Sequence, residues 1–141
     1  MKKTKHMLDM AQRKNLVEQI SSHLSTHGEI ITVYLFGSFA ADEPFSDIDL
    51  GVLLREDVGS PLEYELNLEI ELENIARKPV DIRILNHAPP AFCREVIRCR
   101  RVILDRNPTA RADFESLMIK KAADFMPFRL RYLEDIVHAP I

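Results

Sequence analysis

The sequence predicts one small α/β (α+β) domain in which helices flank a mixed β-sheet. Short β-branched and aromatic runs alternate along the chain with longer segments of helical periodicity. The chain has 141 residues, and no internal repeat or low-complexity linker divides it, so we expect a single domain over residues 1–141. Its composition, 46% hydrophobic and 29% charged, is typical of a globular chain that buries its own core.

The predicted elements follow from local composition and periodicity. Runs rich in β-branched and aromatic residues predict strands over 30–36, 48–54, 80–85 and 101–104. Helical spacing of apolar residues predicts helices over 8–26, 61–76 and 90–99, and from 108 onward. We expect the core of the domain to span about residues 28–105, with a polar loop beginning at Gly37-Ser38.

The helix after residue 60 has the clearest start. Ser60 can cap it, Pro61 suits its first turn, and Glu63 follows the cap by three residues. The apolar residues that carry this helix are expected to be Leu62, Leu66, Ile70 and Ile75.

The C-terminal part is predicted to form helices over about residues 108–137. Pro127 is expected to kink or split this region. It carries more large apolar residues than one narrow core stripe requires, so part of it either covers a partner or packs across the sheet. These residues are Phe114, Leu117, Met118, Phe125, Met126 and Phe128.

Composition also restricts the compartment and the ligands. No apolar run of ~18 residues is present, and no apolar segment follows the basic N-terminus, so we expect neither a membrane span nor a signal peptide. Cys93 and Cys99 are too few for a disulfide framework, which favours a cytoplasmic protein. Residues 42–73 carry eleven acidic residues against Arg55. We therefore expect no direct nucleic-acid binding, and read the charges as divalent-cation ligands or a solvated acidic helix.

The strongest functional signal is Gly37-Ser38, followed after eight residues by Asp47-Ile48-Asp49. Gly37 ends a strand and allows a sharp turn, whose amides, with the Ser38 hydroxyl, can cradle a phosphate. Asp47 and Asp49 are two residues apart in a predicted strand, so both carboxylates point to one face. Such a pair can hold the ions of a two-metal site.

Asp81 is the single acidic residue in the third apolar strand. If that strand lies beside the second, three carboxylates converge, an arrangement that suits metal-assisted phosphoryl or nucleotidyl transfer. Asp81 could complete a metal site or accept a proton from the attacking hydroxyl. Because residues 39–46 contain no Lys or Arg, Arg83 is the candidate for a phosphate contact; the alternative is an ordinary surface arginine.

His23 and His27 are four residues apart in the first predicted helix. Leu24 stands where a zinc protease of this spacing would have a glutamate, so the protease motif is absent. We predict that both are surface histidines.

Two segments, Gly37-Ser38-Phe39-Ala40 and Ser46-Asp47-Ile48-Asp49-Leu50, resemble the signature of DNA polymerase β-type nucleotidyltransferases. The short chain is similar to the minimal nucleotidyltransferases (MNT) of that superfamily. Residues 85–90, 95–97 and 114–129 resemble the MntA-type antitoxins, whose partner is a HEPN-domain RNase toxin.

The resemblance implies a polymerase β-like nucleotidyltransferase fold. It implies that Gly37 and Ser38 contact nucleotide phosphates and that Asp47, Asp49 and Asp81 are catalytic carboxylates that bind Mg²⁺, with two ions expected. It further implies ATP as co-substrate and a hetero-oligomeric complex with the HEPN toxin. AMP would pass to a tyrosine of the toxin, pyrophosphate would leave, and the RNase would be neutralised.

The phosphate loop departs from the family pattern. The family usually has a longer loop here, often with an arginine after the serine, whereas this chain has eight residues and no basic one. Two alternatives therefore stay open. One is a catalytically impaired module that neutralises the toxin sterically; the other is a nucleotidyltransferase that acts on a small-molecule hydroxyl.

Overall fold

Four strands form one mixed sheet in the order β3-β2-β1-β4. The computed structural model describes residues 4–99 and 101–138, with side chains described up to residue 124. β1 (Ile30–Phe36) pairs antiparallel with β2 (Ile48–Leu54) and with β4 (Arg101–Asp105), whereas β3 (Val80–Ile84) runs parallel to β2. The predicted mixed sheet is confirmed, and its four strands fall where their β-branched runs placed them.

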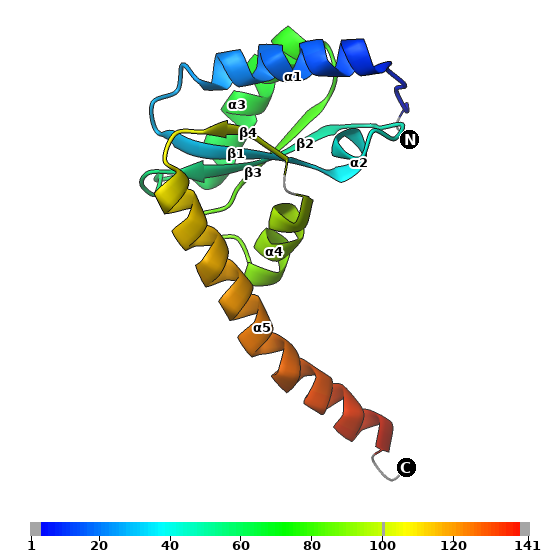
Figure 1. Ribbon diagram of the computed structural model, residues 1–141, viewed down its shortest axis with the longest axis vertical. Helices are drawn as coiled ribbons and strands as arrows, with labels where there is room; N and C mark the ends of the chain where they lie inside the picture. The colour runs from blue at the N-terminus through cyan, green and yellow to red at the C-terminus, as the bar shows by residue number, and fades with distance from the viewer. Residues whose placement is uncertain (1–3, 100, 139–141) are drawn as a thin grey trace.

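Helices cover both faces of the sheet (Figure 1). Two of them, α1 (Met10–Leu24) and α3 (Pro61–Ala76), lie on one face. On the other face lie α4 (Pro90–Cys99) and the first part of α5 (Pro108–His138), whose remaining turns extend away from the sheet. Within the described residues, not even the long α5 has the length and hydrophobicity needed to cross a membrane.

Alternating side chains of β2 separate the two faces. Ile48, Leu50 and Val52 are fully buried against the core formed with α1 and α3. The opposite face carries Asp49 and Gly51. A Cβ on Gly51 would lie 3.1 Å from Val96 of α4, so the missing side chain allows α4 to approach the sheet there. One strand step away, Asp49 remains half-buried.

Three predictions about local structure are wrong. Gly37-Ser38 begins a four-residue helix, α2 (Gly37–Ala40), because the Ala41 N–H donates back to the Gly37 carbonyl at 3.1 Å. Pro127 does not split the C-terminal region, since α5 is one continuous helix. The predicted split is therefore wrong, and the proline, whose φ suits a helix, is accommodated within α5.

The third correction concerns the apolar face of α3. Apolar residues recur at every second position from 62 to 72, which places them on two sides of a helix. The side that packs on the sheet holds Leu68, Leu72 and Ala76, whereas three of the four residues predicted for the apolar face are exposed. The exposed residues are Leu62, Leu66 and Ile70.

Glutamates of α3 cap the free edge of the sheet at β3. Three carboxylates spaced four residues apart accept the three outward N–H groups of that strand. Four helical residues rise about 6 Å and two strand residues about 6.7 Å, so the two rows keep in step. The ladder blocks pairing of another chain at this edge. Its pairs are Glu73 with Val80 at 3.0 Å, Glu69 with Ile82 at 2.8 Å and Glu65 with Ile84 at 2.9 Å.

Part of the C-terminal apolar set lies within the described side chains. Met118 is buried against α4, Phe114 is partly buried beside it, and Leu117 is exposed. The side chains of Phe125, Met126 and Phe128 lie outside the described part of the chain.

Candidate active site

Asp49 and Asp81 lie directly opposite each other on β2 and β3. Neighbouring strands are about 4.8 Å apart, and in-register residues point to the same face of a sheet. Both residues are half-buried at the end of the sheet where β2 and β3 begin. Asp47 precedes β2 by one residue instead of lying within it, and is also half-buried. The expectation that the third strand lies beside the second is confirmed, so the structure brings two predicted carboxylates side by side.

Gly37 holds the backbone against one of these carboxylates. It has a φ of 77°, which L side chains rarely adopt, and a Cβ built on it would collide with the Oδ2 atom of Asp49. Both constraints require glycine at this position. Ser38 follows as an exposed residue in the first turn of α2. The glycine-serine turn and Asp49 therefore form one local unit.

Arg83 lies where the sequence predicted, one strand step beyond Asp81 on the same face. Its Nε atom is 3.4 Å from Oδ1 of Asp81, and 59% of the arginine side chain is exposed. An ion pair this exposed adds little to stability. The guanidinium is thus available to a phosphate that approaches the carboxylates.

Arg13 organises the segment that follows Gly37, and the sequence interpretation missed it. Only 4% of Arg13 is exposed. Its guanidinium donates to the carbonyl oxygens of Phe39 at 3.0 Å and Glu43 at 2.8 Å, and lies 5.3 Å from the Phe45 ring centroid. A signal was present: Arg13 is three residues before Leu16, on the buried stripe of α1.

A second arginine holds the same segment from the other side. Arg101 of β4 donates to the Ala40 carbonyl at 2.7 Å and lies 3.6 Å from the Asp42 carboxylate. Asp42 has a φ of 61°, so the chain turns sharply there. Arg13 and Arg101 both bind backbone carbonyls of this loop, so they stabilise its shape.

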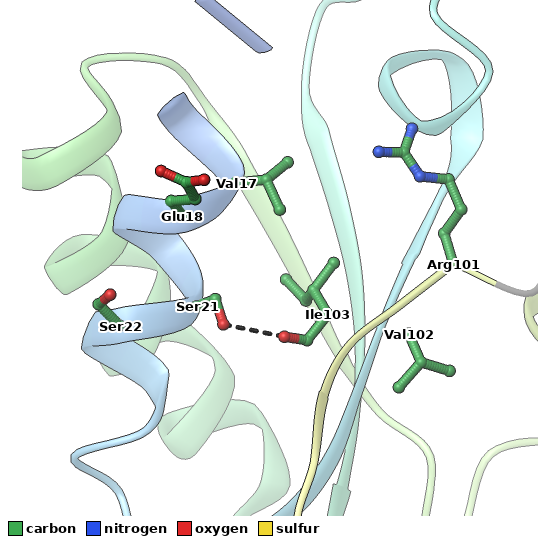
Figure 2. Close-up of a pocket in the computed structure, with 7 residues that line it drawn as sticks. All are labelled: Val17, Glu18, Ser21, Ser22, Arg101, Val102 and Ile103. Carbon is green, nitrogen blue, oxygen red and sulfur yellow. Dashed lines mark hydrogen bonds between the residues drawn. The ribbon is translucent and has the colours of Figure 1, made fainter. Parts of the chain in front are cut away.

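Two depressions of the surface lie on different sides of the sheet. One of about 570 Å³ lies between α1 and β4 (Figure 2). Its wall includes Glu18, Arg101 and Ser21, whose hydroxyl donates to the Ile103 carbonyl at 2.8 Å. A smaller one of about 360 Å³ is lined by Arg83 and Phe92.

Asp81 is paired with Arg83 and also lies near the acidic residues of α3. Burial raises the pKa of Glu69 on α3, and the charges of Asp81, Glu73 and Glu65 raise it further, against the Ile82 N–H that lowers it. A cation near Asp81 would relieve this repulsion. The donor set is made of carboxylate oxygens, which are the ligands that Mg²⁺ prefers.

Comparison with known protein families decides the class of this site. Residues 18–109 match the family described as Polymerase beta, Nucleotidyltransferase. The chain belongs to this family. The matched range contains every residue of the candidate site, from Gly37 to Arg83. The family expected from the Gly-Ser and Asp-x-Asp motifs is confirmed.

Solved structures have the same fold over nearly the full length of this chain and of the matching chains. A crystal structure of the toxin–antitoxin MntA–HepT has a TM-score of 0.67 at 17% identity, covering 92% of this chain and 99% of that one. A tri-AMPylated Shewanella oneidensis HEPN toxin in complex with an MNT antitoxin matches with a TM-score of 0.67 at 20% identity, covering 89% and 98%.

A third structure, of a toxin–antitoxin with AMP-PNP, has a TM-score of 0.66 at 19% identity, covering 92% of this chain and 99% of that one. At these identities the likeness shows the fold, which is the polymerase β-like nucleotidyltransferase fold. Among curated proteins, no sequence is similar enough to count as a match.

Proposed function

We propose that this chain is a Mg²⁺-dependent nucleotidyltransferase that transfers AMP from ATP to a tyrosine of a HEPN-domain RNase toxin and so acts as its antitoxin. The observation that carries the proposal is the pairing of Asp49 with Asp81 across β2 and β3, beside the Gly37 turn. The comparisons support it, because a similar fold occurs with a tri-AMPylated HEPN toxin and in a structure with AMP-PNP.

The residues present fit a magnesium site. Asp47, Asp49 and Asp81 would hold the metal, since all three offer carboxylate oxygens at one end of the sheet. When bound, Mg²⁺ would neutralise the charge that develops on the transferring phosphate. Gly37 leaves the space that the Asp49 carboxylate occupies, so the turn cannot carry a side chain without displacing this ligand.

The residues of the site suit an in-line transfer. The backbone of Gly37 and the hydroxyl of Ser38 would bind phosphate oxygens of ATP. The tyrosine oxygen forms a bond to the α-phosphorus, the bond from that phosphorus to the bridging oxygen of the β-phosphate breaks, and pyrophosphate leaves. Asp81 would either complete the metal site or accept the tyrosine proton, and Arg83 would stabilise the phosphate oxygens.

One observation favours a second function, that of a steric antitoxin without catalysis. Residues 39–46 contain no basic residue, and among the described residues Arg13 and Arg101 both donate to carbonyls of this loop. In that case the chain would neutralise the toxin by covering it. The three carboxylates have no role in such a mechanism, so we place the enzyme first.

The test is the intact mass of a co-expressed HEPN-domain partner after incubation with this protein, ATP and Mg²⁺. We expect a gain of one or more AMP units, and no gain with the Asp47→Ala/Asp49→Ala double variant. Size-exclusion chromatography of both complexes is the control, because the variant must still bind the partner. A complex that forms without any mass gain for the unmodified protein would support the steric function.

A further inference from the structure

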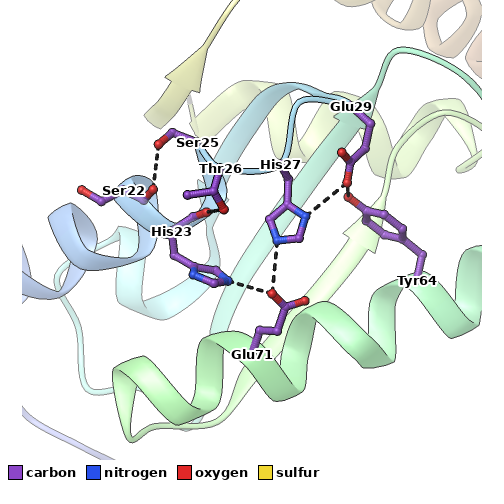
Figure 3. Close-up of polar contacts among 8 residues, drawn as sticks. All are labelled: Ser22, His23, Ser25, Thr26, His27, Glu29, Tyr64 and Glu71. Atoms are coloured by element: carbon purple, nitrogen blue, oxygen red, sulfur yellow. Dashed lines mark hydrogen bonds and ion pairs between the residues drawn. The ribbon is translucent and has the colours of Figure 1, made fainter.

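We propose that His23, His27 and Glu71 bind one divalent transition-metal ion of the Zn²⁺ type (Figure 3). The bound ion would connect the end of α1 to α3. The two histidines come from the last turn of α1 and the turn that follows it, and the glutamate comes from α3. The proposal does not depend on the nucleotidyltransferase function. It goes beyond the prediction of two surface histidines, both of which are partly exposed in the structure.

The distances between the three candidate ligand atoms are close to those between the ligands of one bound ion. Nε2 of His23 is 2.9 Å and Nε2 of His27 is 3.2 Å from the same atom, Oε1 of Glu71, and all three atoms lie within 4.8 Å of one another. Zinc ligands at 2.0–2.1 Å in a tetrahedron are separated by about 3.3 Å. Small side-chain rotations would therefore admit the ion between them, with a fourth position open to water.

The Nδ1 atom of His27 contacts a carboxylate, as the second ring nitrogen of a metal-binding histidine usually does. Nδ1 lies 3.2 Å from Oε1 of Glu29, and the Tyr64 hydroxyl donates to the same oxygen at 2.8 Å (Figure 3). Histidines that bind a metal usually donate their other N–H to a carboxylate, which directs the remaining lone pair at the ion. If Nδ1 donates to Glu29, the lone pair of a neutral His27 ring is on Nε2, which faces Glu71.

Nε2 of His27 can either donate a proton to Glu71 or keep a lone pair and bind a cation together with Glu71. A site of two imidazoles and one carboxylate suits Zn²⁺, and its three protein ligands are the number found where one position stays open. About a quarter of each imidazole side chain is exposed, so an ion can enter from solvent.

This cluster is remote from the candidate active site. His27 lies just before β1 begins, whereas Gly37 follows the end of β1, and a seven-residue strand spans about 20 Å. The cluster also lies on the α1 and α3 side of the sheet, and Asp49 faces the other side. Metal binding here would stabilise the contact between α1 and α3 without touching the carboxylates at the sheet end.

The test is calorimetric titration of the untagged full chain with Zn²⁺ in excess Mg²⁺, which is added to compete for the aspartates. We expect one Zn²⁺ per chain and a rise in Tm on binding. His23→Gln and Glu71→Gln should each lower the affinity at least tenfold. The matched control His87→Gln, in an exposed histidine paired with Asp57, should bind as the unmodified chain does.

A second variant keeps all three ligands. Glu29→Gln should reduce the affinity about 10–100-fold, which is the usual effect of losing such a supporting carboxylate. Circular dichroism of each variant would show whether it is folded. The Co²⁺ form should lack a thiolate-to-metal charge-transfer band, which excludes the exposed Cys99 as a ligand.

Three results would overturn the proposal. They are the absence of Zn²⁺ binding to the unmodified chain, binding that His23→Gln leaves unchanged, and binding that is lost in Asp49→Asn. The first two would mean that the histidines serve only as hydrogen-bond partners of Glu71, and the third that Zn²⁺ occupies the aspartate site. A failure of AMP transfer would leave the Zn²⁺ result unaffected, so the two proposals are tested separately.

Discussion

Two sets of three carboxylates show how differently acidic side chains are used in this molecule. The ladder glutamates of α3 each accept a backbone N–H from the edge strand, at 2.8–3.0 Å. The aspartates lie instead at the end of the sheet, where Asp49 and Asp81 face each other across two parallel strands. The first set satisfies donors of the edge strand; the second places two carboxylates side by side next to the Gly37 turn, where their oxygens can bind a cation.

Hydrogen-bond geometry, rather than charge, therefore distinguishes the carboxylates that stabilise the fold from those of the candidate active site. Five of the six residues fall within the acidic segment 42–73, which composition alone treats as uniform. A carboxylate with a matched N–H donor stabilises the fold and has little affinity left for an ion. Two neighbouring carboxylates repel each other, and a metal relieves the repulsion. Asp49→Asn and Glu69→Ala each change one member of this comparison, whereas Gly37→Ala and Arg83→Gln change a neighbour of the aspartates.

The largest effect is expected for Asp49→Asn. Loss of one charged group of the candidate metal site should reduce AMP transfer by at least about 10²–10³-fold, as removal of a group that stabilises transition-state charge does. We expect thermal stability to change much less than AMP transfer, because asparagine has the size of aspartate and keeps one acceptor oxygen. The mass assay on the HEPN partner measures the first quantity and calorimetry the second. Asp113→Asn, in an exposed residue of α5, is the matched control and should change neither.

Gly37→Ala should damage both fold and activity. A left-handed φ costs a non-glycine residue about 1–3 kcal/mol, and the added Cβ displaces the Asp49 carboxylate. We expect the free energy of unfolding to fall by that amount and AMP transfer to fall with it. Gly59→Ala tests the specificity of the effect, because no atom lies within 4 Å of a Cβ there. An active, fully stable Gly37→Ala protein would contradict the role assigned to this turn.

Glu69→Ala should affect stability and leave catalysis in place. The Ile82 N–H loses its acceptor, which costs about 1–2 kcal/mol of the free energy of unfolding. Glu69→Gln retains an acceptor oxygen and should recover most of this loss. Denaturant unfolding of the two variants, with the mass assay beside it, separates the roles. Loss of AMP transfer in the stable glutamine variant would place Glu69 with the catalytic set and so break the comparison.

The smallest effect is expected for Arg83→Gln. Because the arginine is mostly exposed, its ion pair with Asp81 should contribute less than about 1 kcal/mol to stability. If it stabilises phosphate oxygens, AMP transfer should fall about tenfold, which corresponds to about 1.4 kcal/mol. Arg55→Gln, at the opposite end of β2, is the control. Unchanged transfer in Arg83→Gln would make it the ordinary surface arginine of the alternative interpretation.

Local patterns in the sequence determined much of the structure. The β-branched runs predicted β1 and β2 with the bounds observed, and the Ser60-Pro61 pair predicted the start of α3, where Ser60 accepts the Glu63 N–H at 3.3 Å. Gly37 was predicted as a turn because glycine tolerates positive φ, and it has one. These features depend on neighbours within a few residues, which a single sequence displays directly.

Tertiary structure decided the features that join distant segments. Asp81 is 32 residues from Asp49 in the sequence, and only the parallel pairing of β3 with β2 places them opposite each other. The same packing selected which side of α3 is buried, set Arg13 against the loop after Gly37, and brought Glu71 to His23. Periodicity gives the faces of an element but not its neighbours, because the partner of each face depends on how all the elements pack together.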